Sequence, residues 1–422
     1  MPHGTIVPPR HHRAALYKTW HTPTMPYPTW LPILLGFLSA VGPLSTDMYL
    51  PAFPAIEASL GGRPGTAQIT LATWFVGLAI GQITQGTLAD RYGRRTPLIA
   101  GTLLYTIASA GCALAPNLAT LATLRFISAF GASASMVIPR AIIRDLADGH
   151  AAAHLMSRLM LVMGAAPILA PTLGGLILGV APPAYGWHAI FWFTTTYGAI
   201  GCALVYFFMP DTLPQSHRIK LGLGGIAARF VNLFHDRTFL GFALTGGFST
   251  FGMFAYIGGS SPVFIQHFGF TPPQYGMLFG ISAGMFIVAT QINPRILPRF
   301  GAPRIIRTAL ATYLAATAAM LLFALLGRGG PLAVVLPIML ALFAMGFIIP
   351  NTTVGALSRH AAQAGSASAL MGTLQFGLAA CSGLLVGLFT DGTPRPMAAL
   401  LCLGAALALA ANRLRPRKTN PP

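Results

Sequence analysis

Long apolar runs separated by short polar segments dominate the chain. Each run holds about 20 residues, which is enough for a helix to cross a hydrocarbon core roughly 30 Å thick. Twelve such runs follow one another over the 422 residues, so we predict an all-α membrane protein with twelve transmembrane helices. The predicted spans are 31–53, 67–89, 97–115, 119–143, 155–178, 186–208, 238–260, 272–293, 305–327, 331–353, 366–390 and 395–412.

The composition agrees with this interpretation. Hydrophobic residues make up 54% of the chain, charged residues only 8%, and the mean hydropathy is +0.67. These apolar side chains are too many for one water-soluble core. A signal peptide is the alternative for the first run, but its apolar part is too long and lacks a clear small-residue cleavage site. We therefore expect the first helix to be retained.

The net charge of +18 would suggest a nucleic-acid partner in a soluble protein. In this chain most of the basic residues fall in loops on one side of the predicted membrane. If the N-terminus is cytoplasmic, roughly 22 of the Lys and Arg residues lie on that side, as the positive-inside rule requires. The opposite side holds Arg63, Arg328 and Arg395. The charge therefore predicts cytoplasmic N- and C-termini and no nucleic-acid partner.

A polar stretch after the sixth run divides the chain into two halves. The predicted organisation is an N-terminal arm (1–30), a six-helix bundle (31–209), a cytoplasmic linker (210–237), a second six-helix bundle (238–412) and a tail (413–422). A short repeat supports duplication of one bundle. Arg91-Tyr92-Gly93 recurs 208 residues later as Arg299-Phe300-Gly301 in the equivalent loop, although Pro298 stands where the first copy has Asp90.

Metal and redox chemistry find little support. The four cysteines all fall inside predicted helices, without metal-type spacing, and we expect them to be reduced packing residues. Histidines in the N-terminal arm leave a weak metal site as an alternative to a disordered tail. We expect no resident metal and no cofactor.

The loop after the second span carries a specific motif. A glycine at its start allows close helix approach, a second glycine allows a tight turn, and its aspartate can accept hydrogen bonds at a helix N-terminus or pair with an arginine. Such contacts suit a two-state latch, although an ordinary charged turn is the alternative. The motif residues are Gly86, Asp90, Arg91, Gly93, Arg94 and Arg95, and we add Asp145 from the end of the fourth span. This pattern resembles the signature loop of the major facilitator superfamily.

The fifth span reads Gly164-Ala165-Ala166-Pro167-Ile168-Leu169-Ala170-Pro171-Thr172-Leu173-Gly174-Gly175. Two prolines and a glycine pair make a helix that can bend and that has a flat face for close packing. The run resembles the fifth-helix motif of drug-proton antiporters in that superfamily. The candidate motif residues are Gly164, Pro167, Pro171, Gly174 and Gly175, and a simply bent helix is the alternative.

Three further segments, 45–54, 140–146 and 365–376, resemble the Bcr/CflA drug-resistance transporters. The resemblance covers residues 30 to 412 and implies two pseudo-symmetric six-helix bundles in a bacterial inner membrane. It departs at His188, where the family usually has arginine, so a fixed positive charge at this helix end is in doubt.

Two charges lie at depth in the predicted helices, Asp47 in the first and Arg125 in the fourth. Each is six residues from the outer end of its helix, or roughly 9 Å at 1.5 Å per residue, so the two could share one layer of a cavity. An intramembrane carboxylate is costly and marks a functional site. Burial favours protonated Asp47 and a nearby Arg125 favours the ionised form, so we predict that the two couple transport to protons. The alternatives are a turn role for Asp47 near Pro51 and an Arg125 that snorkels to the interface.

No acidic residue occurs between Asp236 and Asp391, so proton coupling is expected in the N-terminal half. A cavity of aromatic and weakly polar groups would fit lipophilic compounds. The candidate substrate residues are Tyr49, Phe53, Gln82, Phe251, Tyr256, Asn351, Gln375 and Phe376, each of which could instead be a packing residue.

These features predict a secondary active transporter that exports small lipophilic drug-like molecules by alternating access, driven by a proton gradient. Its expected partners are the small-molecule substrate, protons and the bilayer, and we expect a monomer. The alternatives are an exporter of an endogenous metabolite and a proton-coupled uptake carrier. A membrane enzyme is disfavoured because the sequence shows no nucleotide-binding loop, metal-ligand cluster or convincing Ser-His-Asp arrangement.

Overall fold

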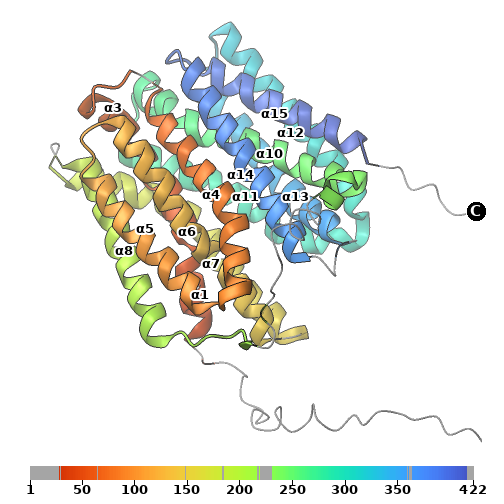
Figure 1. Ribbon diagram of the computed structural model, residues 1–422. Helices are drawn as coiled ribbons and strands as arrows, with labels where there is room; N and C mark the ends of the chain where they lie inside the picture. The colour runs from red at the N-terminus through yellow and green to blue at the C-terminus, as the bar shows by residue number, and fades with distance from the viewer. Residues whose placement is uncertain are drawn as a thin grey trace, which may run out of the picture.

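The computed structural model describes residues 28, 30–63, 65–147, 149–182, 185–215, 218, 231–358, 360 and 364–415. These residues form an all-helical fold (Figure 1). The N-terminal half contains α1 (Leu31–Ser39), α2 (Val41–Asp47), η1 (Leu50–Ala52), α3 (Phe53–Ser59), α4 (Ala67–Tyr92), α5 (Arg95–Ala113), α6 (Leu118–Leu146), α7 (Gly149–Val180) and α8 (Gly186–Phe208). The C-terminal half contains α10 (Arg237–Ser261), η3 (Pro262–His267), α11 (Pro272–Phe300), α12 (Ala302–Leu326), α13 (Leu332–Leu357), α14 (Ala364–Phe389) and α15 (Arg395–Arg413).

The prediction of an all-α membrane protein is confirmed. Eleven described segments are long and apolar enough to cross a bilayer, and the apolar part of α7, Ala165–Val180, lies in the predicted fifth span. Helix ends extend past the predicted spans where polar residues continue the helix. The first segment runs to Ser59 and the eighth to Phe300. Most of the N-terminal arm, much of the linker and most of the tail lie outside the described residues.

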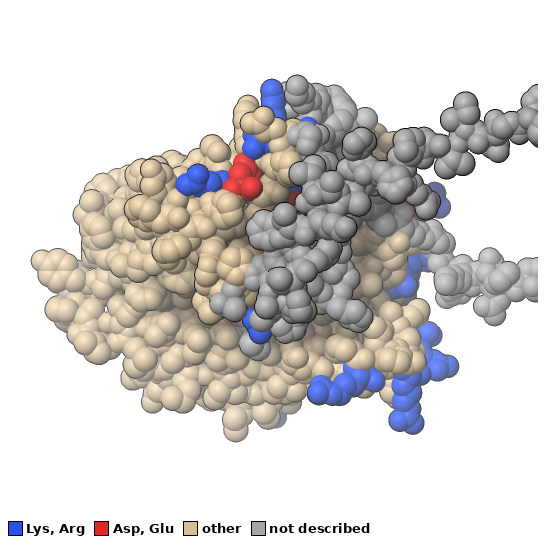
Figure 2. Space-filling model, turned by 90° about the horizontal axis from the view of Figure 1, so that it is seen from below, with Lys and Arg blue, Asp and Glu red and all other residues tan. Residues whose placement is uncertain are grey.

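The two halves lie side by side, the N-terminal half in red to yellow-green and the C-terminal half in green to blue (Figure 1). We call the end of the molecule that holds the Tyr92–Arg94 turn the linker end, and the end that holds Gly65 the distal end. Figure 2 views the linker end, where Lys and Arg side chains are exposed at several places. The helices α4 and α14 form one seam between the halves, and α7 and α11 form the other.

The seams hold the halves together at the distal end and in the middle. The Gln68 side chain donates to the Gly258 carbonyl near the distal end (3.2 Å), and the Thr373 hydroxyl donates to the Ala79 carbonyl further inward (3.0 Å). Thr172 of α7 donates to the Gly276 carbonyl of α11 (3.3 Å). At the linker end, the ion pairs Arg94–Asp90, Arg94–Asp145 and His360–Asp236 each lie within one half. The structure is therefore a state that is closed at the distal end.

The first transmembrane segment is broken in the middle, for a reason visible in its sequence. A helical residue donates its N–H to the carbonyl four positions earlier, and proline has no N–H to donate. Pro43 cannot donate to the Ser39 carbonyl, and α1 ends at Ser39. Pro51 likewise cannot donate to the Asp47 carbonyl, and α2 ends at Asp47. The chain continues through the short helix η1 before α3 begins.

Candidate functional site

A cavity of about 310 Å³ lies between the two halves. Its walls come from the first segment, α4, α6 and α7 on one side and from α10, α11, α13 and α14 on the other. The lining residues are Gly42, Pro43, Thr46, Asp47, Phe75, Leu78, Met136, Met163, Pro167, Thr250, Met253, Phe254, Tyr256, Ile257, Phe279, Ala283, Phe286, Ile287, Leu342, Ile349, Gln375 and Phe376. Asp47 is the one residue among them that carries a formal charge.

Asp47 reaches the cavity from the break in the first segment. It is the last residue of α2, and only 5% of its surface is exposed. The next residue, Met48, presents its main-chain carbonyl to Gly174 of α7 at a distance that leaves no room for a side chain. The antiporter-type motif on α7 therefore packs directly against the break that carries Asp47.

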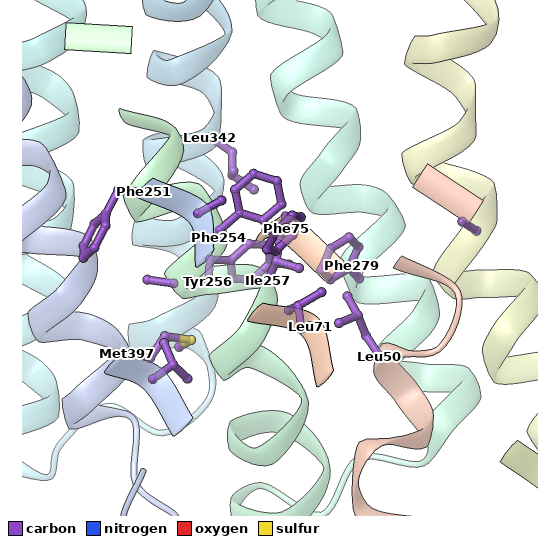
Figure 3. Packing of buried hydrophobic residues seen from close by; sticks show 14 of the residues in the cluster. Leu50, Leu71, Phe75, Phe251, Phe254, Tyr256, Ile257, Phe279, Leu342 and Met397 are labelled. Atoms are coloured by element: carbon purple, nitrogen blue, oxygen red, sulfur yellow. The ribbon is translucent and has the colours of Figure 1, made fainter. Parts of the chain in front are cut away.

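The rest of the wall is aromatic and thioether-rich. Phe75 from α4 and Phe254 from α10 lie with ring centroids 4.2 Å apart, so one wall is shared between the halves. The rings of Tyr256 and Phe279 stack at 5.2 Å with an interplanar angle of 13°. Figure 3 shows Phe75, Phe254, Tyr256 and Phe279 converging on one region, whereas Phe251 lies apart from them. Flat rings and flexible methionines form a surface that adapts to apolar molecules of different shapes.

Three of the predicted substrate residues line this cavity: Tyr256, Gln375 and Phe376. The other five are placed elsewhere. Tyr49 and Phe53 pack against each other inside the N-terminal half with ring centroids 5.0 Å apart. Gln82 is buried beside α14, and Phe251 lies in the core of the C-terminal half. Asn351 donates from its side chain to Asn293 (2.7 Å) and to the Phe347 carbonyl (2.8 Å), which ties α13 to α11.

Sequence reasoning missed most of the aromatic and thioether wall. Phe75, Met136, Met163, Met253, Phe254 and Phe279 line the cavity. Each is an apolar residue in an apolar helix, so nothing local separates it from a residue that faces lipid. The packing of the two halves along α4–α14 and α7–α11 decides which face is inside.

Arg125 does not pair with Asp47 in this state. Its guanidinium carbon lies 4.2 Å from the ring centroids of both Tyr49 and Trp74, and 5.8 Å from that of Phe191. No ion pair within 4.0 Å joins Arg125 to a carboxylate in the described part of the chain, and its Nε and Nη2 have no hydrogen-bond partner there. The two side chains therefore form no ion pair in this state, and their shared depth stays a prediction. Arg125 sits in an aromatic cage within the N-terminal half, because its face of α6 points to the interior of that half.

The latch motif forms a hub of charges at the linker end. Arg94 donates from Nε to Asp145 (2.7 Å) and from Nη1 to Asp90 (2.5 Å), and its main-chain N–H donates to Asp211 (2.8 Å). Arg218 of the linker pairs with the other oxygen of Asp211 (2.8 Å). Burial alone would lower the pKa of Arg94, but the contacts with Asp145 and Asp90 outweigh it, so the pKa is raised. One guanidinium thus joins α4, α6 and, through its own turn, the linker.

The other motif residues occupy the same turn. Gly93 has φ +91°, a conformation that favours glycine. Arg91 lies over the ring of its neighbour Tyr92, and Arg95 donates to a main-chain carbonyl of α8 (2.7 Å). At Gly86 an added Cβ would meet its nearest neighbour at 3.7 Å, an ordinary contact. The expected need for close helix approach at Gly86 is therefore absent in this state.

The antiporter-type motif lies on α7 and shapes the seam with α11. Pro167 and Pro171 both stand inside the helix. An added Cβ at Gly175 would lie 2.6 Å from the Pro272 carbonyl of the other half. Gly174 faces the break in the first segment, as described above, and Gly164 lies within α7. The glycine pair thus permits two main-chain approaches on neighbouring faces of one helix.

Comparisons with known proteins agree with this architecture. The family model for the Major Facilitator Superfamily matches residues 35–384. An uncharacterized MFS-type transporter of Bacillus subtilis is 36% identical over 392 residues, which cover 92% of this chain and 95% of that protein. A bicyclomycin resistance protein homolog of Haemophilus influenzae is 32% identical, with 89% and 93% covered. A solved bacterial homolog of the human lysosomal transporter Spinster, inward-facing and occupied, superposes with a TM-score of 0.73 at 15% identity, covering 93% of this chain and 99% of that one.

A family match over most of the chain, together with two helical halves around a central cavity, leaves no place for an enzyme assignment. Drug-resistance proteins stand among the relatives. The chain belongs to the major facilitator superfamily and is a multi-pass membrane transporter.

Proposed function

We propose that this transporter exports small lipophilic compounds in exchange for protons. The observation that carries the proposal is Asp47, a lone carboxylate at a helix break in the wall of an otherwise uncharged cavity. A buried carboxylate can hold a proton without a second titrating partner. Substrate and proton can then compete for the same small space, which is the minimum that exchange requires.

The wall chemistry supports a lipophilic substrate. Rings from both halves and three methionines offer apolar contact, and Thr46, Thr250 and Gln375 add a few polar groups. The relative named for bicyclomycin resistance supports the export direction. We propose drug-like molecules as the substrate class, with an endogenous metabolite as the second candidate.

The orientation follows from the basic residues. We propose that the linker end and both termini face the cytoplasm of a bacterial inner membrane, because Lys and Arg concentrate on that side. The state described here would then open toward the cytoplasm and be ready to load substrate. We further propose that the transporter works as a monomer, because each chain encloses its own cavity.

Arg125 enters the proposed cycle indirectly. Its guanidinium lies on the ring of Tyr49. Tyr49 comes two residues after Asp47 in the same broken segment. A rearrangement of that break when the distal end opens would change the distance between Arg125 and Asp47. In this proposal the positive charge of Arg125 stabilises the ionised form of Asp47 in one state, and the protonated form is favoured in the other.

A susceptibility panel in an efflux-deficient bacterial host tests the proposal. The chain should raise tolerance to one or more lipophilic compounds, and Asp47→Asn should remove that tolerance at equal expression. Asp391→Asn is the matched control, because Asp391 lies in an exposed distal loop. Full tolerance with Asp47→Asn would refute the role of this carboxylate.

Everted membrane vesicles test the coupling itself. A compound identified in the panel should release protons from energised vesicles that carry the native chain, and release should be absent with Asp47→Asn. Accumulation of the compound without any proton movement would reject exchange, and movement of both in the same direction would favour uptake.

A further inference from the structure

A second groove, of about 660 Å³, lies on the outside of the C-terminal half near the linker end. It is formed where the end of α11, the start of α12 and the middle of α13 meet. Its walls include Phe300, Arg304, Arg307, Leu340 and Phe343. Phe300 is 48% exposed and Leu340 46% exposed, so the groove opens to the surroundings and not into the central cavity.

The groove is polar at one end and apolar along its length. Arg304 and Arg307 belong to the first two turns of α12, close to the linker end. Thr312 lies eight residues after Arg304, which places it about 12 Å deeper along the helix. Leu340 and Phe343 of α13 form the apolar wall at that depth. A molecule that fits must carry its polar group at the membrane surface and its apolar part toward the bilayer centre.

The two arginines have no anionic partner among the residues that the structure describes. Neither side chain makes a hydrogen bond or an ion pair in the described part of the structure, and both are exposed. The sequence has no acidic residue from 237 to 390. No carboxylate of α10 to α14 is therefore available to these two cations.

The equivalent turn of the N-terminal half shows what is missing. There Arg94 follows Gly93 and is held by Asp90 and Asp145. In the second copy of the motif Gly301 has φ +71°, which keeps the tight turn, but Pro298 replaces the aspartate. Ala302 stands where the first copy has Arg94, so the turn is kept without its ion pair, and the basic residues that follow it are Arg304 and Arg307.

We propose that this groove holds one anionic phospholipid of the leaflet on the linker side, with its phosphate between Arg304 and Arg307 and an acyl chain along Leu340 and Phe343. Guanidinium groups match phosphate geometry, and basic pockets between transmembrane helices recognise anionic headgroups. The inference concerns the lipid-facing surface and does not depend on the substrate, the direction of transport or Asp47.

The test uses the purified full-length chain in detergent, with native mass spectrometry to count bound phosphatidylglycerol during a titration. The native chain should retain one phosphatidylglycerol molecule with higher affinity than the rest. Arg304→Gln combined with Arg307→Gln should weaken this site by roughly 30-fold, since each basic residue near a lipid surface contributes about fivefold in affinity. The matched control, Arg63→Gln with Arg328→Gln, removes two distal arginines and should leave the site unchanged.

A second variant tests the apolar half of the groove. Thr308 is exposed on α12 between the arginines and Thr312, so Thr308→Trp fills the groove and keeps both charges. It should also weaken phosphatidylglycerol binding.

Three results would overturn the inference: equal affinity in the arginine variant, equal affinity for phosphatidylcholine, or displacement of the lipid by inorganic phosphate at similar concentrations. The last of these would assign the arginines to a free anion.

Discussion

Arg94 pairs with two carboxylates, Asp90 and Asp145, and the strengths of the two ion pairs can be compared by experiment. Distance alone would rank Asp90 first, because its oxygen lies 2.5 Å from Arg94 Nη1 against 2.7 Å for the nearest oxygen of Asp145. Burial gives the opposite order. The Asp90 side chain is 47% exposed and that of Asp145 is 16% exposed. We expect burial to decide, because water screens an exposed pair.

The magnitudes follow from the same two exposures. A hydrogen-bonded charge pair that is largely shielded from water contributes about 2 kcal/mol. An exposed pair four residues apart on one segment contributes about 0.5 kcal/mol. The coupling free energy between Arg94 and Asp145 should therefore exceed that between Arg94 and Asp90 by about 1.5 kcal/mol, which is a factor of about ten in an equilibrium constant.

Double-mutant cycles measure both couplings. The variants are Arg94→Gln, Asp145→Asn and Asp90→Asn with the two corresponding doubles, all close in shape to the native residues. Unfolding is followed by tryptophan fluorescence in mixed micelles with increasing sodium dodecyl sulfate. A coupling of Arg94 to Asp90 equal to or larger than that to Asp145 would refute the argument from burial.

Two other predictions concern the seam between α7 and α11 and the loss of folding stability at low pH. The added methyl group in Gly175→Ala should clash with the Pro272 carbonyl of α11, cost about 1–3 kcal/mol and loosen the distal seam. A cysteine placed in that seam should then be labelled at least tenfold faster. Gly86→Ala is the control, and labelling at the same rate in both variants would contradict the prediction. Partial burial alone would raise the pKa of Asp236. Hydrogen bonds from the Thr238 N–H and from His360 outweigh burial, so the pKa of Asp236 is lowered. Its stabilisation is therefore complete at neutral pH and disappears as pH falls through that lowered pKa, so Asp236→Ala should cost about 1 kcal/mol at pH 7 and less below about pH 4. Thermal unfolding of both proteins from pH 7 to pH 3 measures this, and a difference independent of pH would be evidence against it.

The fold was predictable because hydrophobic runs of bilayer length carry most of the information in a membrane protein. The interruption of the first segment coincides with Pro43 and Pro51, which lack the N–H groups that would donate to Ser39 and Asp47. Proline alone does not decide where a helix breaks, because Pro139 and Pro167 stand inside continuous helices. The hub at the linker end was partly predictable, since the motif named Asp90, Arg94 and Asp145. Asp211 lies 117 residues from Arg94 in the chain and was not predicted.

The direction in which a side chain points was not predictable. Asp47 and Arg125 were placed at matched depth by counting residues from helix ends, but depth says nothing about the rotation of a helix about its axis. Polar residues such as Gln82 and Asn351 were chosen as ligand groups because they are polar, yet buried polar groups are usually paired within the protein. Asn351 is paired in this way with Asn293.

The central cavity has a consequence for water. A volume of about 310 Å³ corresponds to roughly ten water molecules at liquid density. Aromatic and thioether walls hold such water weakly, so it is held mainly by Asp47 and by the few polar groups Thr46, Thr250 and Gln375. A change in the charge of Asp47 is therefore expected to change how much water the cavity holds.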